Sequence, residues 1–113
     1  MEHFFYCGAG AAPIGIVGLE FCGSHALLRS LAVAPERRRS GVGAQLVEHA
    51  ERYARAQGIH SIFLLTTTAE EFFKRRGYAV TDRSNAPAEI RATKEFAHIC
   101  PSGSAFLSKR ITL

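Results

Sequence analysis

Cysteine and long apolar runs are scarce in this sequence of 113 residues. No apolar run approaches the roughly 20 residues of a membrane-spanning helix, and the start, MEHFFYCGAG, lacks the basic and apolar regions of a signal peptide. Cys7, Cys22 and Cys100 are widely spaced and form no C-x-x-C pair, which argues against a disulfide framework and against a zinc site. We therefore expect a soluble, cytoplasmic protein that has reduced thiols and no metal.

Acidic side chains are also in the minority, because 10 Asp and Glu stand against 14 Lys and Arg, which gives a formal net charge of +4. This excess favours an anionic partner and leaves nucleic acid, a membrane surface and a nucleotide-bearing cofactor open. The apolar fraction of 47% supports a buried core and excludes wholesale disorder. Length and composition together indicate one domain over residues 1–113.

Strand-forming runs alternate with amphipathic segments along the chain. The patterns predict strands at 3–9, 14–22, 26–33, 59–67, 78–82 and 104–111, and helices at 42–57, 69–77 and 86–99. Strand 26–33, helix 42–57 and strand 59–67 form a β-α-β crossover, whose strands are parallel and whose hand is right. The other strands should pair antiparallel. We therefore predict an α/β (α+β) fold: a mixed, mostly antiparallel sheet with helices on both faces.

Two local patterns belong to the predicted helices. Thr68 and Glu71 have the spacing of a capping box at the start of helix 69–77. Arg91 and Glu95, four residues apart, are most simply a surface ion pair on helix 86–99.

The segment ERRRSGVGAQLVEHA (36–50) places three arginines and a Gly-x-Gly pair at the start of helix 42–57. The first amides of a helix have no internal partner and carry partial positive charge. Gly41 and Gly43 have no Cβ to keep an anion away from those amides, and Arg37–Arg39 add full charges. This is the chemistry of a phosphate or pyrophosphate site, although Gly-x-Gly alone is equally explained as a helix start. The Walker motif and the three-glycine dinucleotide motif are both missing.

Two ordered motifs give the segment a more specific meaning. LAVAPERRRSGVGAQLVEHA resembles the cofactor motif of the GNAT superfamily of acetyl-CoA-dependent N-acetyltransferases, [Q/R]-x-x-G-x-[G/A], here Arg38-x-x-Gly41-x-Gly43. TAEEFFKRRGYAV resembles the second landmark of that superfamily, A-x-x-F-Y-x-x-x-G-[FY]. Three further stretches, ALLRSLAVAPE, LLTTTAEEFFKRRGY and APAEIRATKEFAHICP, resemble the ArsN-type arsenic-resistance N-acetyltransferases, a GNAT subgroup. The resemblance implies a GNAT-like domain that transfers acetyl groups to a small primary amine, with a link to arsenic resistance.

The resemblance also implies where acetyl-CoA would bind. Strands 26–33 and 59–67 would start side by side and splay apart, so that the backbone of Leu31 to Val33 could pair with the pantetheine arm. The amides from Arg39 to Ala44 would hold the pyrophosphate. The residues expected to contact the coenzyme are Leu31, Ala32, Val33, Arg38, Arg39, Ser40, Gly41, Val42, Gly43, Ala44 and Phe73.

The catalytic residues are less clear from the pattern. Many GNAT members have a tyrosine acid where this chain has Phe73, so that the thiolate would take its proton from Tyr78 or from water. Glu20 would serve either as the general base or as the ion-pair partner of an arginine such as Arg29. His25 is a second candidate base, or a solvent-exposed turn residue.

Several polar side chains are candidates for holding the acceptor. Arg29 could bind a substrate carboxylate or form a plain salt bridge. Thr66 and Thr67 end a splayed strand and are either substrate contacts or structural. Cys22 and Cys100 are thiols that a soft thiophile such as trivalent arsenic could use, although packing is the simpler interpretation.

GNAT domains generally begin with a strand and two helices, and this sequence starts without them. Either the start was trimmed or a second subunit covers the acceptor side, and we expect a homodimer because Phe4, Phe5 and Tyr6 lie on a sheet edge. An alternative function is a catalytically impaired remnant that binds acetyl-CoA without turnover. A nucleic-acid-binding module is disfavoured because no stacking aromatics accompany the arginines, and we expect neither nucleic acid nor membrane as a partner.

Overall fold

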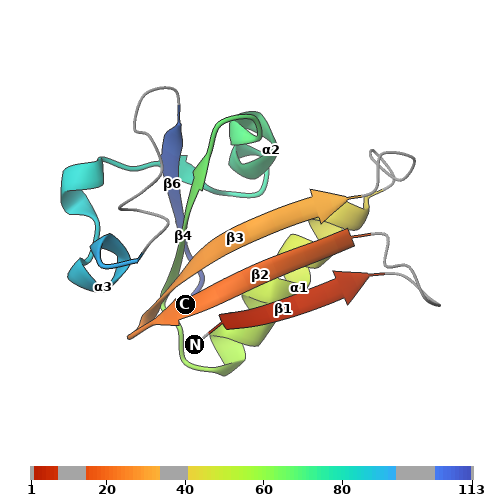
Figure 1. The fold of residues 1–113 in the computed structure, drawn as a ribbon, viewed down its shortest axis with the longest axis horizontal. Helices are drawn as coiled ribbons and strands as arrows, with labels where there is room; N and C mark the ends of the chain where they lie inside the picture. Colours follow the sequence, from red (N-terminus) through yellow and green to blue (C-terminus); the bar gives the residue numbers. More distant parts are fainter. Residues whose placement is uncertain (1, 8–14, 34–40, 94–103, 113) are drawn as a thin grey trace.

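The computed structural model describes residues 2–7, 15–33, 41–93 and 104–112. The elements in chain order are β1 (Glu2–Cys7), β2 (Gly15–Cys22), β3 (His25–Val33), α1 (Val42–Ala56), β4 (Ser61–Thr66), α2 (Glu70–Lys74), β5 (Ala79–Val80), the 3₁₀ turn η2 (Arg83–Asn85), α3 (Ala88–Arg91) and β6 (Ala105–Arg110). The strands form one sheet in the order β1-β2-β3-β4-β6-β5 (Figure 1). The pair β3–β4 is parallel and the other neighbours are antiparallel, which confirms the predicted mixed sheet with its central β-α-β crossover.

The two parallel strands separate after a short pairing. They pair from His25 with Ser61 to Leu28 with Leu64, and β3 then follows β2 while β4 follows β6, so that the strands diverge (Figure 1). The β2–β3 register also shifts just there, because Ile16 pairs with Ala32 and Gly18 pairs with Arg29. One extra residue on β3 is a β-bulge, which bends the strand and leaves backbone groups unpaired. The splay therefore opens the sheet beside the end of β3.

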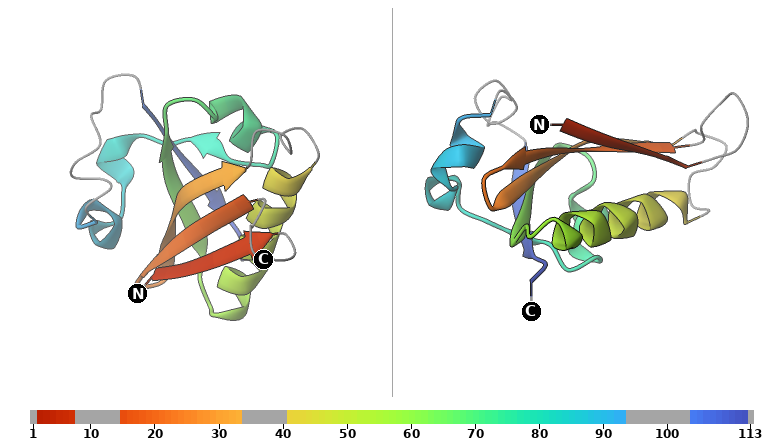
Figure 2. Two further views of the ribbon diagram at one scale, coloured as in Figure 1. Left: turned by 45° about the vertical axis from the view of Figure 1, so that its right-hand side comes forward. Right: turned by 90° about the horizontal axis from the view of Figure 1, so that it is seen from below.

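The sheet is covered on both faces, as predicted. Helix α1 runs along β1, β2 and β3 (Figure 2, right), and its spacing of apolar residues puts one stripe against the sheet. The buried residues of α1 on this stripe include Val42, Leu46, Val47, Ala50 and Ala54. Alternate residues of the strands face the other way and pack with α3. This second core cluster contains Cys22, Leu27, Phe63, Ala86, Ile90 and Phe106.

The helix predicted over 86–99 is wrong in its described part. Helix α3 ends at Arg91, and residues 92 and 93 form a turn in which the Thr93 hydroxyl donates to the Ile90 carbonyl at 2.7 Å. A threonine that bonds back to the chain competes with helix continuation. Glu95 and its predicted pairing with Arg91 lie outside the described residues.

The capping box predicted for the next helix upstream is also wrong. The N-cap of α2 is Ala69 and has no side-chain hydrogen bond. The hydroxyl of Thr66 instead accepts from the amides of Thr68 at 3.3 Å and Ala69 at 3.0 Å. Helix α2 therefore starts one residue later than the box requires and is shorter than the predicted 69–77. None of the described helices is long and apolar enough to cross a membrane.

Candidate active site

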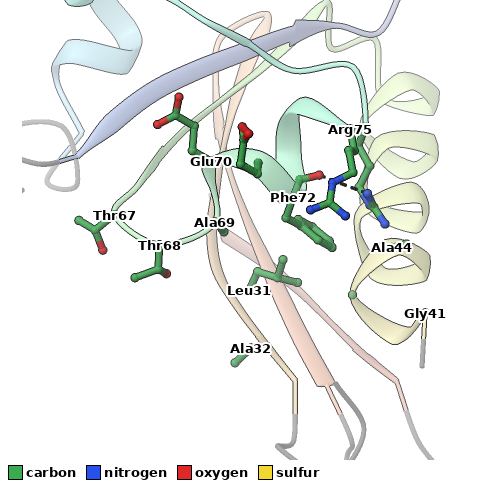
Figure 3. Close-up of a pocket in the computed structure, with 13 residues that line it drawn as sticks. Leu31, Ala32, Gly41, Ala44, Thr67, Thr68, Ala69, Glu70, Phe72 and Arg75 are labelled. Atoms are coloured by element: carbon green, nitrogen blue, oxygen red, sulfur yellow. Dashed lines mark hydrogen bonds between the residues drawn. The ribbon is translucent and has the colours of Figure 1, made fainter. Parts of the chain in front are cut away.

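A cavity of about 950 Å³ lies where the end of β3, the start of α1 and helix α2 meet. Figure 3 shows Thr67 and Thr68 at one side of its opening, with Ala44 and Arg75 at the other and Leu31 and Phe72 between them. Its lining residues are Leu31, Ala32, Gly41, Gly43, Ala44, Thr67, Thr68, Ala69, Glu70, Glu71, Phe72, Arg75 and Arg76. The volume is at the upper end of the range for small-molecule sites, about 300–1,000 Å³, so the cavity can hold a large elongated ligand.

The start of α1 forms an open amide cluster at this cavity. Gly41 is the N-cap in a left-handed conformation (φ 88°), and no side chain caps the helix. A Cβ added at Gly41 would meet nothing within 4 Å. The first amide that bonds within the helix is that of Gln45, to Gly41. Among the described residues, the amides of Val42, Gly43 and Ala44 therefore remain available to an anion.

The predicted coenzyme residues other than Phe73 divide into three groups. Leu31, Ala32, Gly41, Gly43 and Ala44 line the large cavity together. The side chain of Val42 is buried in the core, so that only its amide could contribute. Arg37, Arg38, Arg39 and Ser40 lie outside the described residues, and so does the side chain of Val33.

Helix α2 and the turn after it contribute side chains that the sequence motif does not single out. The Arg76 guanidinium carbon lies 4.1 Å from the centre of the Phe72 ring, and its Nη1 donates to the Phe72 carbonyl at 3.2 Å. Arg75 is exposed and lines the same cavity. The only signal in the sequence is the pair of arginines just before Gly77, which reads equally well as solvated surface.

A smaller cavity of about 270 Å³ adjoins the large one inside the splay. Both cavities share Leu31, Thr67, Thr68 and Ala69, and the small one begins where β3 and β4 stop pairing, at Leu28 and Leu64. Its remaining lining residues are Leu27, Arg29, Leu65, Thr66 and Phe73. Among the described residues that line this cavity, Arg29 is the one cation.

Glu20 and Arg29 form the ion pair that the sequence left as one of two alternatives. Arg29 Nη1 lies 3.3 Å from Glu20 Oε1, and each side chain is about a quarter exposed (25% and 26%). Glu20 pairs across the ladder with Leu27, so Arg29, two residues further along β3, is its diagonal neighbour on the same face. Arg29 lines the small cavity. Its guanidinium is therefore within reach of a molecule bound there.

The predicted acid Tyr78 lies away from both cavities. Its hydroxyl donates to Glu51 Oε2 at 2.9 Å, and Lys109 Nζ lies 3.1 Å from Glu51 Oε1. Burial, with Glu51 as a second cause, raises the pKa of Tyr78 well above that of a free phenol. Such a group is a poor proton donor and lines neither cavity, so the structure does not support Tyr78 as the substitute acid.

The other predicted side chains are distributed unevenly. Phe73, 3% exposed, lines the small cavity and packs edge-on against Tyr78. His25 lies edge-on to Phe63, and Cys22 is a buried free thiol whose pKa burial raises; neither lines a cavity. The Thr66 hydroxyl is engaged with the start of α2, whereas Thr67 is exposed at both cavities. Cys100 lies outside the described residues.

Comparison with known proteins settles the family. The model of the acetyltransferase (GNAT) family matches residues 2–78, which is more than half of the chain. The chain belongs to this family. The fold, with a mixed and mostly antiparallel six-stranded sheet, is therefore the GNAT fold predicted from the motifs.

Two curated relatives show how far the likeness extends. Over 94 residues the GNAT chain is 42% identical to an uncharacterized N-acetyltransferase of Chlorobaculum tepidum, covering 80% of this chain and 60% of the relative. Over 61 residues it is 43% identical to the amino-acid acetyltransferase of Pseudomonas fluorescens, covering 54% of this chain and 14% of that protein. The chain thus spans 60% or less of the length of these relatives.

Solved GNAT structures superpose over almost the whole chain. N-acetylglutamate synthase from Neisseria gonorrhoeae, complexed with coenzyme A and N-acetyl-glutamate, has a TM-score of 0.85 at 25% identity, covering 97% of this chain and 26% of that one. The protein Rv2747 from Mycobacterium tuberculosis, in complex with CoA and NLQ, has a TM-score of 0.80 at 21% identity, covering 95% of this chain and 75% of that one. The second likeness shows the fold alone.

Proposed function

We propose that this chain is an acetyl-CoA-dependent N-acetyltransferase that moves the acetyl group to the primary amine of a small molecule. The observation that carries the proposal is the open start of α1, where Gly41 leaves the first amides uncovered beside the splay of β3 and β4. Family membership and a relative solved with coenzyme A support the same ligand. The residues present fit such a ligand, because the free amides of α1 suit its diphosphate and the unpaired backbone of β3 suits its uncharged pantetheine arm.

Each part of the coenzyme has a counterpart in the large cavity. The amides of Val42, Gly43 and Ala44 would hold the diphosphate, supported by the dipole of α1. The unpaired backbone beside Leu31 and Ala32 would bond to the pantetheine arm as a neighbouring strand does. The thioester end would then reach the small cavity, which adjoins through the residues that the two share.

The acceptor would occupy the small cavity, where Arg29 could bind a carboxylate. Glu20 lines neither cavity but pairs with Arg29, and from that position it could accept a proton from the amine. Amino-acid acetyltransferases among the relatives support an acceptor that carries both groups. The described chain offers no tyrosine acid there, because Phe73 has no hydroxyl and Tyr78 is engaged with Glu51. The departing thiolate would therefore take its proton from water, which a thiol of pKa about 8.5 tolerates. Holding both reactants together supplies much of the rate enhancement.

The narrower ArsN-type assignment and a role in arsenic resistance stay part of the proposal. They rest on the sequence stretches quoted above, of which APAEIRATKEFAHICP lies partly outside the described residues. We also propose a homodimer, because β1 is an edge strand of the sheet. Sedimentation at two protein concentrations tests the dimer, and a monomer at both contradicts it.

Calorimetric titration of acetyl-CoA into the purified chain tests the proposal. We expect micromolar binding that Gly43→Glu abolishes, because a carboxylate there would occupy the amides and repel the phosphates. Gln45→Glu is the matched control, since it adds the same charge to the same helix on an exposed side chain outside the cavity lining. No binding by the unaltered chain, or equal loss in both variants, would contradict the proposed site.

A coenzyme-binding chain without turnover is the second candidate, and the phenylalanine at position 73 favours it. A thiol-release assay over a panel of small amines, amino acids and arsenic-containing amino acids separates the two. Release above the acceptor-free rate supports the enzyme. Tight binding of acetyl-CoA with no release on any acceptor supports the second candidate.

A further inference from the structure

We propose that Arg75 and Arg76 form an anion subsite that binds the 3′-phosphate of coenzyme A, on the α2 wall of the large cavity. The inference rests on the proposed function, since it assigns a second anchoring point to the same ligand. Both arginines line the cavity together with Gly41, Gly43 and Ala44 at the start of α1. The subsite therefore shares one cavity with the amides proposed for the diphosphate.

Arg76 is held in place before any ligand binds. Its guanidinium lies on the Phe72 ring, 4.1 Å from the ring centre, and Nη1 donates to the Phe72 carbonyl at 3.2 Å. A cation over an aromatic face is attracted by the ring, and a planar guanidinium fixed in this way loses little freedom on binding a phosphate. Within the described part of the chain, Nε is buried without a hydrogen-bond partner, and the second terminal nitrogen, Nη2, takes no part in the bond to Phe72. Arg76 is thus oriented while keeping donors for a ligand.

Arg75 adds a second cation to the same wall. It is exposed, and Figure 3 shows it on the α1 side of the cavity. No ion pair or hydrogen bond joins its side chain to another described residue, in contrast to Lys74 one position earlier. The backbone at this point is fixed, because the amides of Arg75 and Arg76 bond to the carbonyls of Glu71 and Phe73.

The acidic residues of the wall do not cancel this charge. Glu70 and Glu71 also line the cavity, and Lys74 Nζ lies 2.8 Å from Glu70 Oε2 and 3.6 Å from Glu71 Oε2. One lysine thus offsets part of the charge of two carboxylates, while Arg75 and Arg76 add two cations. Counting these five side chains, the local balance is positive and favours an anion.

The chemistry of coenzyme A matches the division into two anion sites. Its diphosphate suits a row of main-chain amides at a helix start. Its 3′-phosphate is a monoester dianion, which guanidinium groups bind through paired, charge-assisted hydrogen bonds. Because the α1 amides can serve only one of the two groups, the arginines across the cavity are assigned to the other.

The test compares coenzyme A with 3′-dephospho-coenzyme A by calorimetry. The unaltered chain should bind coenzyme A about tenfold or more tightly than the dephospho compound, as one or more charged hydrogen bonds predict. The variant Arg75→Gln/Arg76→Gln should bind both compounds with similar affinity, and its affinity for the dephospho compound should match that of the unaltered chain. Arg76→Lys, which keeps the charge but not the planar fork, should lie between them. Arg52→Gln, on exposed α1 surface outside the cavity, is the matched control.

The other outcomes contradict the inference in different ways. If the double variant binds both compounds more weakly by the same factor, the arginines serve the diphosphate. If the unaltered chain does not distinguish the two compounds, no 3′-phosphate subsite exists, although the proposed function stands. If neither compound binds, the proposed function fails as well. Circular dichroism of each variant establishes that folding is unchanged.

Discussion

The two adjoining cavities are lined by different parts of the fold. The large cavity, of about 950 Å³, owes its shape to helix ends and to backbone that the splay leaves unpaired. The small cavity, of about 270 Å³, is lined mostly by leucine and threonine residues, and Arg29 is the one cation among its described lining residues. Backbone groups can hold a coenzyme with many different side chains around them, whereas a side-chain wall can be altered residue by residue. The contrast predicts that substitutions will affect the coenzyme and the acceptor separately.

The largest expected effect comes from the core behind the small cavity. Ile90 is fully buried in the same cluster as Leu27, which also lines that cavity. Ile90→Ala should lower the free energy of unfolding by about 2–5 kcal/mol, through lost burial and the void left behind. In urea titrations the exposed control Val80→Ala should change it by less than about 0.5 kcal/mol.

The same variant tests the separation of the two cavities. In the folded Ile90→Ala protein, we expect KM for the acceptor to rise and the Kd for acetyl-CoA to stay unchanged. If the acceptor and acetyl-CoA both bind more weakly by the same factor, the two cavities respond as a single site.

The next effect concerns Arg29. Arg29→Gln removes a charged hydrogen-bond donor worth about 1.5–3 kcal/mol, so KM for an acceptor with a carboxylate should rise by about 10- to 100-fold. The affinity for acetyl-CoA should not change. Arg52→Gln, which removes an arginine from an exposed ion pair on α1, is the control. If KM rises equally for acceptors with and without a carboxylate, the Glu20–Arg29 pair has a structural role and does not bind the acceptor.

Two glycines at opposite ends of α1 provide a matched pair for the large cavity. Gly41 (φ 88°) and Gly58 (φ 84°) are both left-handed, and an added Cβ at either would meet nothing within 4 Å. Alanine at each should therefore cost a similar amount of stability, about 1–2 kcal/mol. Only Gly41→Ala should also weaken acetyl-CoA binding severalfold, because only Gly41 lies at the cavity. An equal loss of affinity in Gly58→Ala would mean that strain in α1, and not the amides, controls binding.

The sequence predicted those parts of the site that depend on neighbouring residues. Gly41 and Gly43 define the start of α1 because helix caps are local, and the β-α-β crossover follows from the order of strand, helix and strand. The ion pair of Glu20 with Arg29 was accessible because a hairpin brings together residues that are near in sequence. The fold class followed from the same local signals.

The rest depended on contacts that no local pattern specifies. The Thr68–Glu71 box fits the capping spacing, yet the Thr66 hydroxyl accepts from the amides of residues 68 and 69, because β4 ends at Thr66 just before them. Tyr78 was a candidate acid in the sequence because its partners Glu51 and Lys109 are distant along the chain, with Glu51 27 residues away. In the sequence, Arg75 and Arg76 are typical of solvated surface, whereas the structure shows that both line the large cavity.

The smallest effect is expected for Tyr78→Phe, which tests whether this residue belongs to the site at all. The variant loses one buried hydrogen bond to Glu51, which Lys109 still pairs, so the stability at pH 7 should fall by about 1 kcal/mol. The rate kcat should stay unchanged, since the hydroxyl lines neither cavity. A large fall in kcat without loss of acetyl-CoA affinity would restore Tyr78 as the acid.

The pH dependence of the same variant gives a second readout. Burial and Glu51 raise the pKa of Tyr78 in the folded chain, whereas the unfolded phenol titrates near pH 10. Above that pH the unfolded state loses a proton that the folded state keeps, so the contribution of this group to stability is complete below pH 10 and declines as pH rises. Urea unfolding from pH 7 to 11 should therefore show the advantage of the unaltered chain over Tyr78→Phe shrinking above pH 10. A constant difference would mean that the phenol is not held protonated by its buried position, and the argument that removes Tyr78 from the chemistry would lose its physical basis.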